Sequence, residues 1–159
     1  MGEQASEETK VSDAEKLYRL WVKYEYEVVK KKRRPNPSAS ALKLFNKALT
    51  KRTRLAIELY LNHFYTSPDQ WTSYMRVNGY TKPENLFRKQ NLESRVDEAV
   101  ARYIYDANIP EYAYKEVEWT EYRGRQAYVG DDGSTKVVFG GEKEIQKWMS
   151  LAKELGIKK

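Results

Sequence analysis

The sequence predicts a mainly α fold: a helical bundle of five to six helices, with a C-terminal β-hairpin and a final helix as an α+β appendage. Two observations predict this fold. Up to Pro110, helix-start signals recur, and each is followed by apolar residues at helical spacing. After Pro110, short alternating stretches are separated by turns that contain glycine, which is typical of strands. A chain of 159 residues has the size of one domain with a small addition.

This pattern divides the chain into three parts. Residues 1–11 are expected to be a mobile acidic tail. Residues 12–110 are expected to form the helical body, which contains a basic segment at 30–54, and residues 111–159 the β-hairpin and C-terminal helix. The sequence has no long apolar run, so no membrane partner is expected, and the absence of cysteine excludes a disulfide framework and a thiolate metal site.

A capping box of Ser12 and Glu15 opens the first helix, which is expected to extend to about Lys32. Pro35 and Pro37 end it, because the residue before a proline avoids the helical conformation. One face carries the apolar stripe that is expected to face the core: Leu17, Trp21, Tyr24 and Val28.

Two further helices are expected before residue 66. The first begins near Ser38 or Ser40, and its inward residues are Leu42, Phe45 and Leu49. The second covers residues 51–65 with Thr50 as its N-cap. Its leucines alternate as they would in a strand, but the length of the run and its lack of Gly and Pro favour a buried helix.

Two short helices and a longer one complete the predicted body. In "SPDQW", Ser67 is the expected N-cap and Pro68 the first helical residue. "TKPENLF" repeats this arrangement with Thr81 and Pro83. A helix over residues 91–107 follows.

The C-terminal part combines strand and helix patterns. "YKEVEWTEY" alternates around Trp119, and "RQAYV" and "TKVVF" flank the turn-rich linker "GDDGS" as the strands of a hairpin do. A final helix over residues 142–155 is expected to stop at Gly156.

The stretch "QWTSYMRVNGYTKPENLFRKQNLES", residues 70–94, resembles the conserved C-terminal domain of phage replication proteins, relatives of DnaD-like replisome organisers and helicase loaders. The similarity covers residues 42–96, since the upstream "LTKRTRLAIELYLNHF" is similar to the basic helix before the family's tryptophan. The positions that match the motif are Trp71, Tyr80, Lys82, Pro83, Glu84, Leu86, Phe87, Leu92 and Glu93. Of these, the expected core of the motif is Trp71, Pro83, Leu86 and Phe87. The resemblance implies DNA binding in replication or delivery of a helicase.

The basic segment dominates the charge of the chain. The net charge is +6, yet residues 30–54 contain ten Lys and Arg and no Asp or Glu. Lysines and arginines that meet phosphates release counterions, so this segment predicts nucleic-acid binding without sequence reading. The residues concerned are Lys30, Lys31, Lys32, Arg33, Arg34, Lys43, Lys47, Lys51, Arg52 and Arg54. The alternatives are an acidic protein partner, an anionic membrane, or a solvated face with no ligand.

Aromatic residues near the basic segment suggest where single-stranded bases would stack. Tyr74 and Tyr80 are the candidates for stacking, while Trp71 and Phe87 follow helix-start signals and are expected to anchor the core.

No enzyme, metal site or cofactor is predicted. His63 is the only histidine, and on a buried helix it is interpreted as a packing residue. Asp131 and Asp132 lie in "GDDGS" and are interpreted as turn formers. The sequence contains no glycine-rich phosphate loop and no hydrolase or zinc-protease motif.

Three functions therefore remain open. The first is a phage-type DNA replication accessory protein that binds nucleic acid, DNA rather than RNA, and recruits a replicative helicase or another host protein. The second is a protein-binding module that acts on a host factor in host takeover or anti-defence. The third is a DNA-binding regulator or packaging subunit with a helix-turn-helix near residues 40–65. Each would act in the cytoplasm, which is the host's if the chain is phage-encoded.

Overall fold

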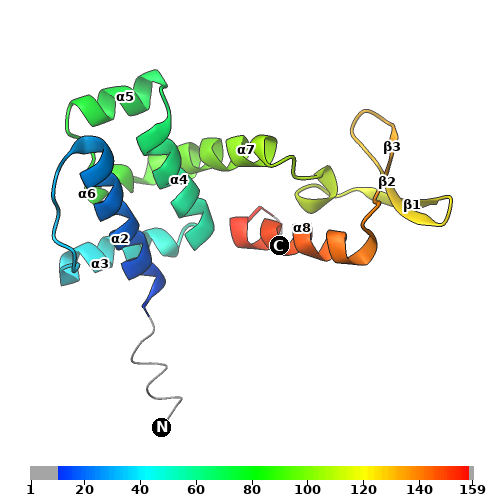
Figure 1. The fold of residues 1–159 in the computed structure, drawn as a ribbon, viewed down its shortest axis with the longest axis horizontal. Helices are drawn as coiled ribbons and strands as arrows, with labels where there is room; N and C mark the ends of the chain where they lie inside the picture. Colours follow the sequence, from blue (N-terminus) through cyan, green and yellow to red (C-terminus); the bar gives the residue numbers. More distant parts are fainter. Residues whose placement is uncertain (1–10, 158–159) are drawn as a thin grey trace, which may run out of the picture. The chain divides into compact units, whose positions relative to one another are not determined.

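The fold was analysed in a computed structural model that describes residues 11–157. It is mainly helical with a small antiparallel sheet near the C-terminus, as predicted (Figure 1). The chain divides into two compact units between Ala99 and Val100, within a helix, whereas Pro110 was the predicted boundary. The predicted acidic tail lies almost wholly outside the described residues.

The first unit consists of helices joined by short connections (Figure 1). Two of its elements, η1 and η2, are single turns of π-helix, and α7 continues into the second unit. The bounds are α2 Asp13–Tyr24, η1 Glu25–Val29, α3 Ala39–Leu49, α4 Arg54–Thr66, α5 Gln70–Val77, α6 Pro83–Leu86, η2 Asn91–Arg95 and α7 Val96–Asp106.

Side-chain caps begin α2 and α3. The Ser12 hydroxyl accepts the backbone N–H of Glu15 at 3.2 Å, which confirms the predicted cap of α2. The Ser38 hydroxyl accepts the N–H of Ala41 at 3.1 Å, so Ser38 rather than Ser40 begins α3. Both caps satisfy N–H groups that have no partner inside the helix.

The predicted caps of α4 and α5 are wrong. Thr53, not Thr50, caps α4, because the Thr50 hydroxyl donates to the Lys47 carbonyl at 2.6 Å and so belongs to the end of α3. Asp69, not Ser67, caps α5, and the helix begins after Pro68. Its carboxylate accepts the N–H of Thr72, in the first turn of α5, at 2.8 Å and is a stronger acceptor than a hydroxyl because it is charged.

The predicted apolar stripe of α2 changes after Trp21. Glu25 takes the next buried position and is fully buried, while Val28 is exposed. Glu25 keeps the regular helical spacing from Trp21, whereas the π-turn η1 begins at Glu25 and holds an extra residue, which rotates the residues that follow and takes Val28 out of the stripe.

Aromatic and aliphatic side chains from α2, α3, α4 and α6, and from the first residue of α7, form the core of the first unit. The Tyr60 hydroxyl crosses this core and donates to the Leu86 carbonyl at 2.7 Å, which joins α4 to α6. The large buried side chains are Leu17, Tyr18, Trp21, Phe45, Ile57, Tyr60, Leu61, Phe64, Tyr65, Leu86 and Val96.

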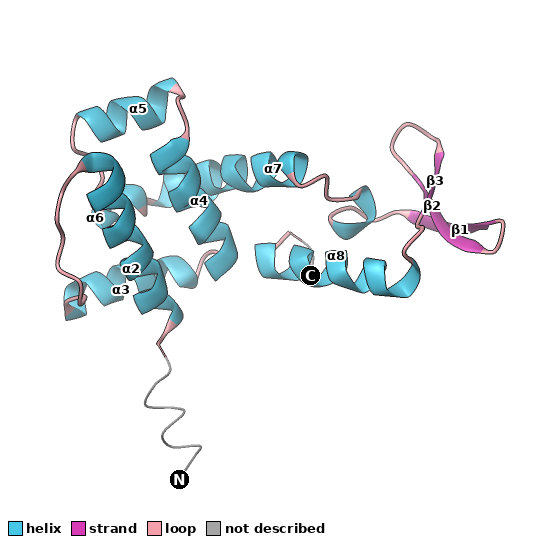
Figure 2. Cartoon of the chain, in the orientation of Figure 1, coloured by secondary structure: helices cyan, strands magenta, loops and turns pink. Residues whose placement is uncertain are grey.

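The second unit contains all three described strands (Figure 2). Besides the end of α7, its elements are η3 Glu111–Ala113, a turn of 3₁₀-helix, then β1 Glu118–Tyr122, β2 Arg125–Val129, β3 Thr135–Val137 and α8 Gly141–Leu155. The strands are antiparallel in the order β1-β2-β3, so the predicted hairpin is β2–β3 and β1 adds a third strand.

Turn chemistry explains the sheet. Arg123 and Gly124 both have positive φ, 51° and 77°, which suits a two-residue hairpin loop between β1 and β2. Asp132 acts as a turn former, as predicted, because its carboxylate accepts the N–H of Ser134 at 2.9 Å. Gly156 ends α8 in the left-handed conformation, also as predicted.

Within residues 11–157, no helix is both long and apolar enough to cross a membrane.

Candidate nucleic-acid interface

Residues 30–34, here called the basic arm, follow η1 and are not helical. The predicted extension of the first helix to Lys32 is therefore wrong. Lys30 has left-handed backbone geometry with φ 63°, and the N–H of Lys31 donates back to the Glu25 carbonyl at 2.9 Å, which closes the helix. The Lys30 ammonium donates to the Glu27 carbonyl at 2.8 Å and is used at this helix end.

The side chain of Arg33 turns inward from the arm. Its Nε and Nη2 donate to one oxygen of the Glu25 carboxylate at 3.0 and 2.8 Å. The Glu25 side chain is fully buried and that of Arg33 is 23% exposed. The guanidinium also lies over the Trp21 ring, 5.4 Å from its centroid.

Two further hydroxyls complete what we call the Glu25 node: Glu25, Arg33, Tyr65 and Thr81. The Thr81 hydroxyl donates to Glu25 at 3.0 Å and the Tyr65 hydroxyl at 2.7 Å, so both carboxylate oxygens are satisfied. Burial and the adjacent carboxylate raise the pKa of Tyr65 well above its usual range. Thr81 therefore serves the node, and α6 begins after Lys82 without the predicted Thr81 side-chain cap.

The node fixes Arg33, near the end of the arm, to η1, α4 and the loop before α6, because Glu25, Tyr65 and Thr81 come from these segments. Trp21 adds a further link, since its indole N–H donates to the Thr81 carbonyl at 2.9 Å. At the far end of the arm, the Tyr18 hydroxyl donates to the Arg34 carbonyl at 2.7 Å. The arm is thus held at its start by the bond from the Lys31 N–H to the Glu25 carbonyl, and at its end by Arg33 and the Arg34 carbonyl.

Three of the ten predicted phosphate contacts are engaged within the protein. Arg33 belongs to the node. Arg52 pairs with Asp97 at 2.7 Å and donates to the Leu92 carbonyl at 3.1 Å. Arg54 pairs with Asp13 and Glu58. Carboxylates largely neutralise their positive charge, so these three arginines are less suited to phosphate than the unpaired cations, and their phosphate contacts stay a prediction.

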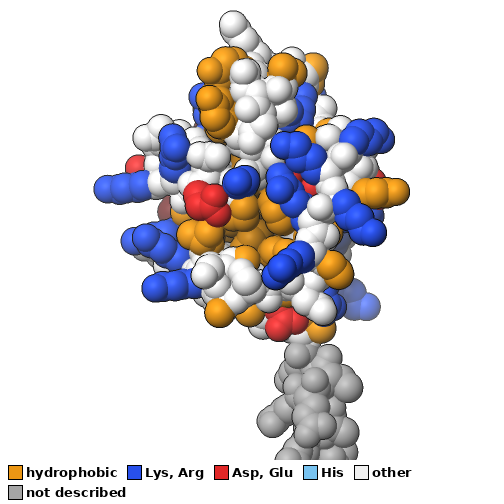
Figure 3. Space-filling model, turned by 90° about the vertical axis from the view of Figure 1, so that its left-hand side faces the viewer, with side chains coloured by type: hydrophobic (Ala, Val, Ile, Leu, Met, Phe, Trp, Pro, Cys, Tyr) orange, Lys and Arg blue, Asp and Glu red, His pale blue; other side chains and the backbone are white. Residues whose placement is uncertain are grey.

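Lys30 is used at the helix end, where it donates to the Glu27 carbonyl. The other six cations are exposed, and none forms an ion pair with a carboxylate of the described residues. Half of them lie in the basic arm and half on α3 or directly after it. Figure 3 shows one face of the molecule, on which Lys and Arg surround hydrophobic side chains and few acidic side chains are visible. These exposed cations are Lys31, Lys32, Arg34, Lys43, Lys47 and Lys51.

Tyr74 and Tyr80 form an exposed aromatic pair beside the basic arm. Their ring centroids are 6.2 Å apart, and the residues are 57% and 45% exposed. A β-carbon added to Gly79 would lie 3.7 Å from Lys31 Nζ, so this ammonium reaches the residue next to Tyr80. The structure therefore brings together a cation and two aromatic rings that the sequence analysis predicted separately.

The motif residues divide into buried and half-buried ones. Pro83 and Leu86 are buried, as predicted. Trp71 is only partly buried, because it lies at the edge of α5, where the Arg95 guanidinium covers its ring at 4.2 Å. Phe87 is also partly buried, with its ring 4.9 Å from that of Phe45 in an edge-to-face arrangement. Trp71 and Phe87 therefore contact the core, through Phe64 and Phe45, but are not fully buried in it.

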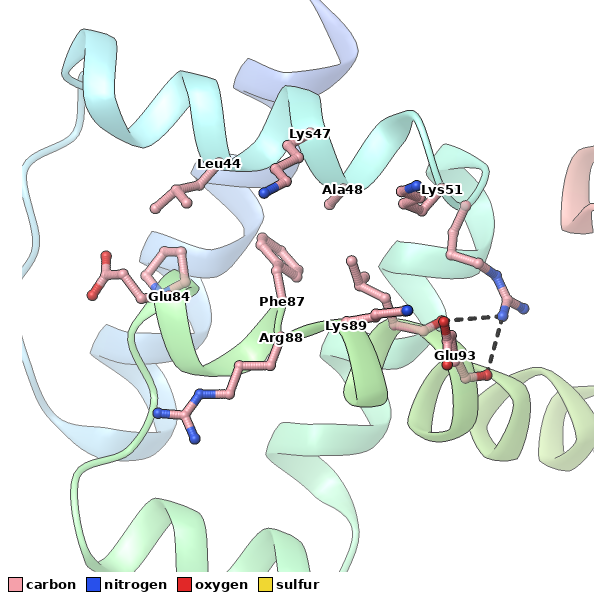
Figure 4. Close-up of a pocket in the computed structure, with 12 residues that line it drawn as sticks. Leu44, Lys47, Ala48, Lys51, Glu84, Phe87, Arg88, Lys89 and Glu93 are labelled. Carbon is pink, nitrogen blue, oxygen red and sulfur yellow. Dashed lines mark hydrogen bonds between the residues drawn. The ribbon is translucent and has the colours of Figure 1, made fainter.

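Phe87 is partly exposed because it lines a cavity of about 750 Å³, here called the basic groove. In Figure 4, Leu44 and Lys47 project from α3 toward Phe87 on the opposite wall. The apolar lining comes from α3 on one side and from α6 to η2 on the other: Leu44, Ala48, Pro83, Phe87 and Leu92.

Charged side chains surround this lining. The acidic members are Glu84 and Glu93. The basic members are Lys47, Lys51, Arg52, Arg88 and Lys89. Arg88 and Lys89 were not among the predicted binding residues, although they directly follow the Leu-Phe step of the motif. They line the groove only because α3 lies opposite, which no local sequence pattern indicates.

His63 is partly buried on α4, and its Nε2 lies 3.5 Å from the Asp69 carboxylate. No group of three or more His, Asp or Glu side chains within residues 11–157 is arranged to hold a metal ion.

No protein-family model, curated protein or solved structure matches this chain.

Proposed function

We propose that the protein is a non-catalytic DNA-binding accessory of phage-type DNA replication, and that it holds single-stranded DNA on Tyr74, Tyr80 and the basic arm. The observation that carries the proposal is the position of Lys31 beside the exposed tyrosine pair. Bases stack on exposed aromatic rings, while neighbouring cations track the phosphates, and together these make a binding site that tolerates any sequence. The assignment to replication rests on the resemblance of residues 42–96 to phage replication proteins.

The geometry supports this proposal better than a sequence-reading regulator. Helices α3 and α4 are joined by residues 50–53, a spacing that a helix-turn-helix would have. A recognition helix must present side chains to the bases of the major groove. Helix α4 instead buries much of its surface, and its one arginine, Arg54, is paired with Glu58 and Asp13.

The test is binding of the full chain to fluorescent oligonucleotides, measured by anisotropy across a salt series. We expect oligo-deoxythymidine to bind more tightly than a duplex of the same length, since only unpaired bases can stack on the tyrosines. Tyr74→Ala and Tyr80→Ala are each expected to weaken single-strand binding by about 1 kcal/mol or more.

The basic arm is tested with the triple variant Lys31→Gln, Lys32→Gln and Arg34→Gln. Each lost phosphate contact reduces the log–log salt slope by about 0.7 for a single strand, so the slope is expected to flatten by about two. The matched control replaces three exposed lysines on α2 and α8, Lys16, Lys23 and Lys143, by Gln. Absence of binding at low salt, or equal slopes for the two triple variants, would refute the proposed site.

A further inference from the structure

We infer that the basic groove is a docking site for an acidic amphipathic helix of a partner protein. This goes beyond DNA binding, because the groove uses side chains that the tyrosine pair and the basic arm do not contain. It is open to solvent at Phe87, and a cavity of about 750 Å³ can take several side chains of a ligand.

The lining of the groove requires an apolar ligand surface. Leu44 and Phe87 are only partly buried and face each other across it (Figure 4). Ala48, between them and Leu92, leaves room because its side chain is small. Apolar side chains spaced three and four residues apart on a helix would enter such a groove from one side.

The rim requires a negatively charged ligand. Lys47, Lys51 and Lys89 form no ion pair with any carboxylate of the described residues, while Arg52 is neutralised by Asp97. With Arg88 the rim keeps four cations against the two carboxylates of Glu84 and Glu93. Aspartate and glutamate on the flanks of an inserted helix would lie opposite these cations, which favours association and orientation.

A nucleic acid fits this groove less well than a peptide does. Phe87 is the single aromatic residue of the lining, and its ring already meets Phe45 edge-to-face at 4.9 Å, so it offers no second ring for a neighbouring base. Glu84 and Glu93 would lie close to the phosphates and repel them. These observations separate the groove from the tyrosine pair, where both rings are exposed.

Hydrogen bonds fix the two walls of the groove to each other. Arg52 holds the carbonyls of Leu92 and Glu93 at 3.1 and 3.4 Å, which fixes the η2 wall to the end of α3. A preformed site loses less conformational entropy when its ligand binds.

The test is a selection of peptides from a random library of about 16 residues, roughly four helical turns, on the immobilised full-length protein. We expect the enriched peptides to be acidic, with apolar residues at positions i, i+3 or i+4, and i+7. Synthetic copies with a fluorophore are then titrated with the protein, and a shuffled version of each peptide serves as its control. Enrichment of neutral or basic peptides, or equal binding of shuffled peptides, would overturn the inference.

Variants on α3 locate the binding site. Lys47→Glu is expected to weaken binding of the selected peptides about tenfold, because it places a like charge on the rim. Lys43→Glu is the matched control, since Lys43 lies one turn earlier on the same helix and does not line the groove. Leu44→Gln removes apolar lining and is expected to weaken binding as well, with a thermal melt to show that the variant is folded. Equal affinities of all three variants would overturn the inference.

A competition experiment separates this inference from the DNA proposal. Excess oligo-deoxythymidine is expected to leave the peptide bound, and Lys47→Glu to change DNA affinity no more than Lys43→Glu does. If the oligonucleotide displaces the peptide and Leu44→Gln also abolishes DNA binding, the groove is part of the DNA site and the peptide inference fails. If the arm and tyrosine variants leave DNA affinity unchanged while Lys47→Glu and Leu44→Gln still weaken peptide binding, the DNA proposal fails and the peptide inference stands.

Discussion

Arg33 and its neighbours Lys31, Lys32 and Arg34 carry the same charge within four residues but occupy opposite environments. Arg33 pairs with a fully buried carboxylate, whereas the other three side chains are exposed and have no carboxylate partner among residues 11–157. The difference comes from Glu25, which lies one helical turn after Trp21 on the buried face of the first helix. A cluster of like charges in a sequence can therefore contain both a structural residue and a ligand-binding surface.

The largest loss of stability is expected at Arg33. Arg33→Gln leaves the Glu25 carboxylate buried without its cation, which typically costs about 3–5 kcal/mol of unfolding free energy. Lys32→Gln, one residue earlier, should change the unfolding free energy by less than about 0.5 kcal/mol because it is a surface change. Urea titrations of both variants measure the difference, and similar values would mean that the node does not stabilise the fold.

A smaller effect is expected at Tyr65. Tyr65→Phe removes one hydrogen bond to the buried carboxylate and should cost about 1–3 kcal/mol. Thermal melts near neutral pH measure this loss. A change within about 0.5 kcal/mol would show that the hydroxyl contributes little to the node.

The Tyr65 hydroxyl also predicts a pH dependence of stability. Its pKa is raised in the folded protein by burial and by Glu25, so the phenol stays protonated when folded but ionises near pH 10 when unfolded. The stability that it contributes is present below about pH 10 and is lost as the pH rises further. Unfolding of the wild type and Tyr65→Phe is compared at about pH 7 and about pH 10.5, and the variant should show the smaller decrease. Equal decreases would argue against this assignment.

The smallest effect on stability is expected for the exposed cations of the basic arm. The triple variant of Lys31, Lys32 and Arg34 should melt within a few degrees of the wild type, because none of these side chains is buried or paired with a described carboxylate. Its binding of single-stranded DNA should nevertheless weaken strongly at low salt. A large loss of stability in this variant would mean that the arm is structural throughout and that its DNA effect is indirect.

Local signals in the sequence predicted most of the fold. Ser12 and Gly156 mark helix ends that depend on the backbone of one turn, so their chemistry can be read from neighbouring residues. The helical character of residues 54–66 and the β2–β3 hairpin were also predicted, because apolar spacing and turn residues are local properties.

The site could be predicted only in part, because it depends on contacts between distant residues. The basic segment and the tyrosines were identified, but not that Arg33 would bind a carboxylate eight residues earlier or that Arg52 would bind one 45 residues later. Burial of Glu25 could not be expected either, since apolar periodicity in an uninterrupted helix favours Tyr24 and Val28 for the core. The groove likewise requires α3 and α6 to lie opposite each other.

The π-turn η1 has a consequence for how relatives of this chain could be recognised. Because each residue of an α-helix turns the chain by about 100°, removal of one residue between Tyr24 and Lys30 would restore a regular helix and rotate the arm away from Tyr65 and Thr81. In an alignment, a one-residue gap at this place would mark a homologue that keeps the helices but has lost the anchor of its arm. Conserved length across η1 would then be as informative about descent and function as conserved residue identity.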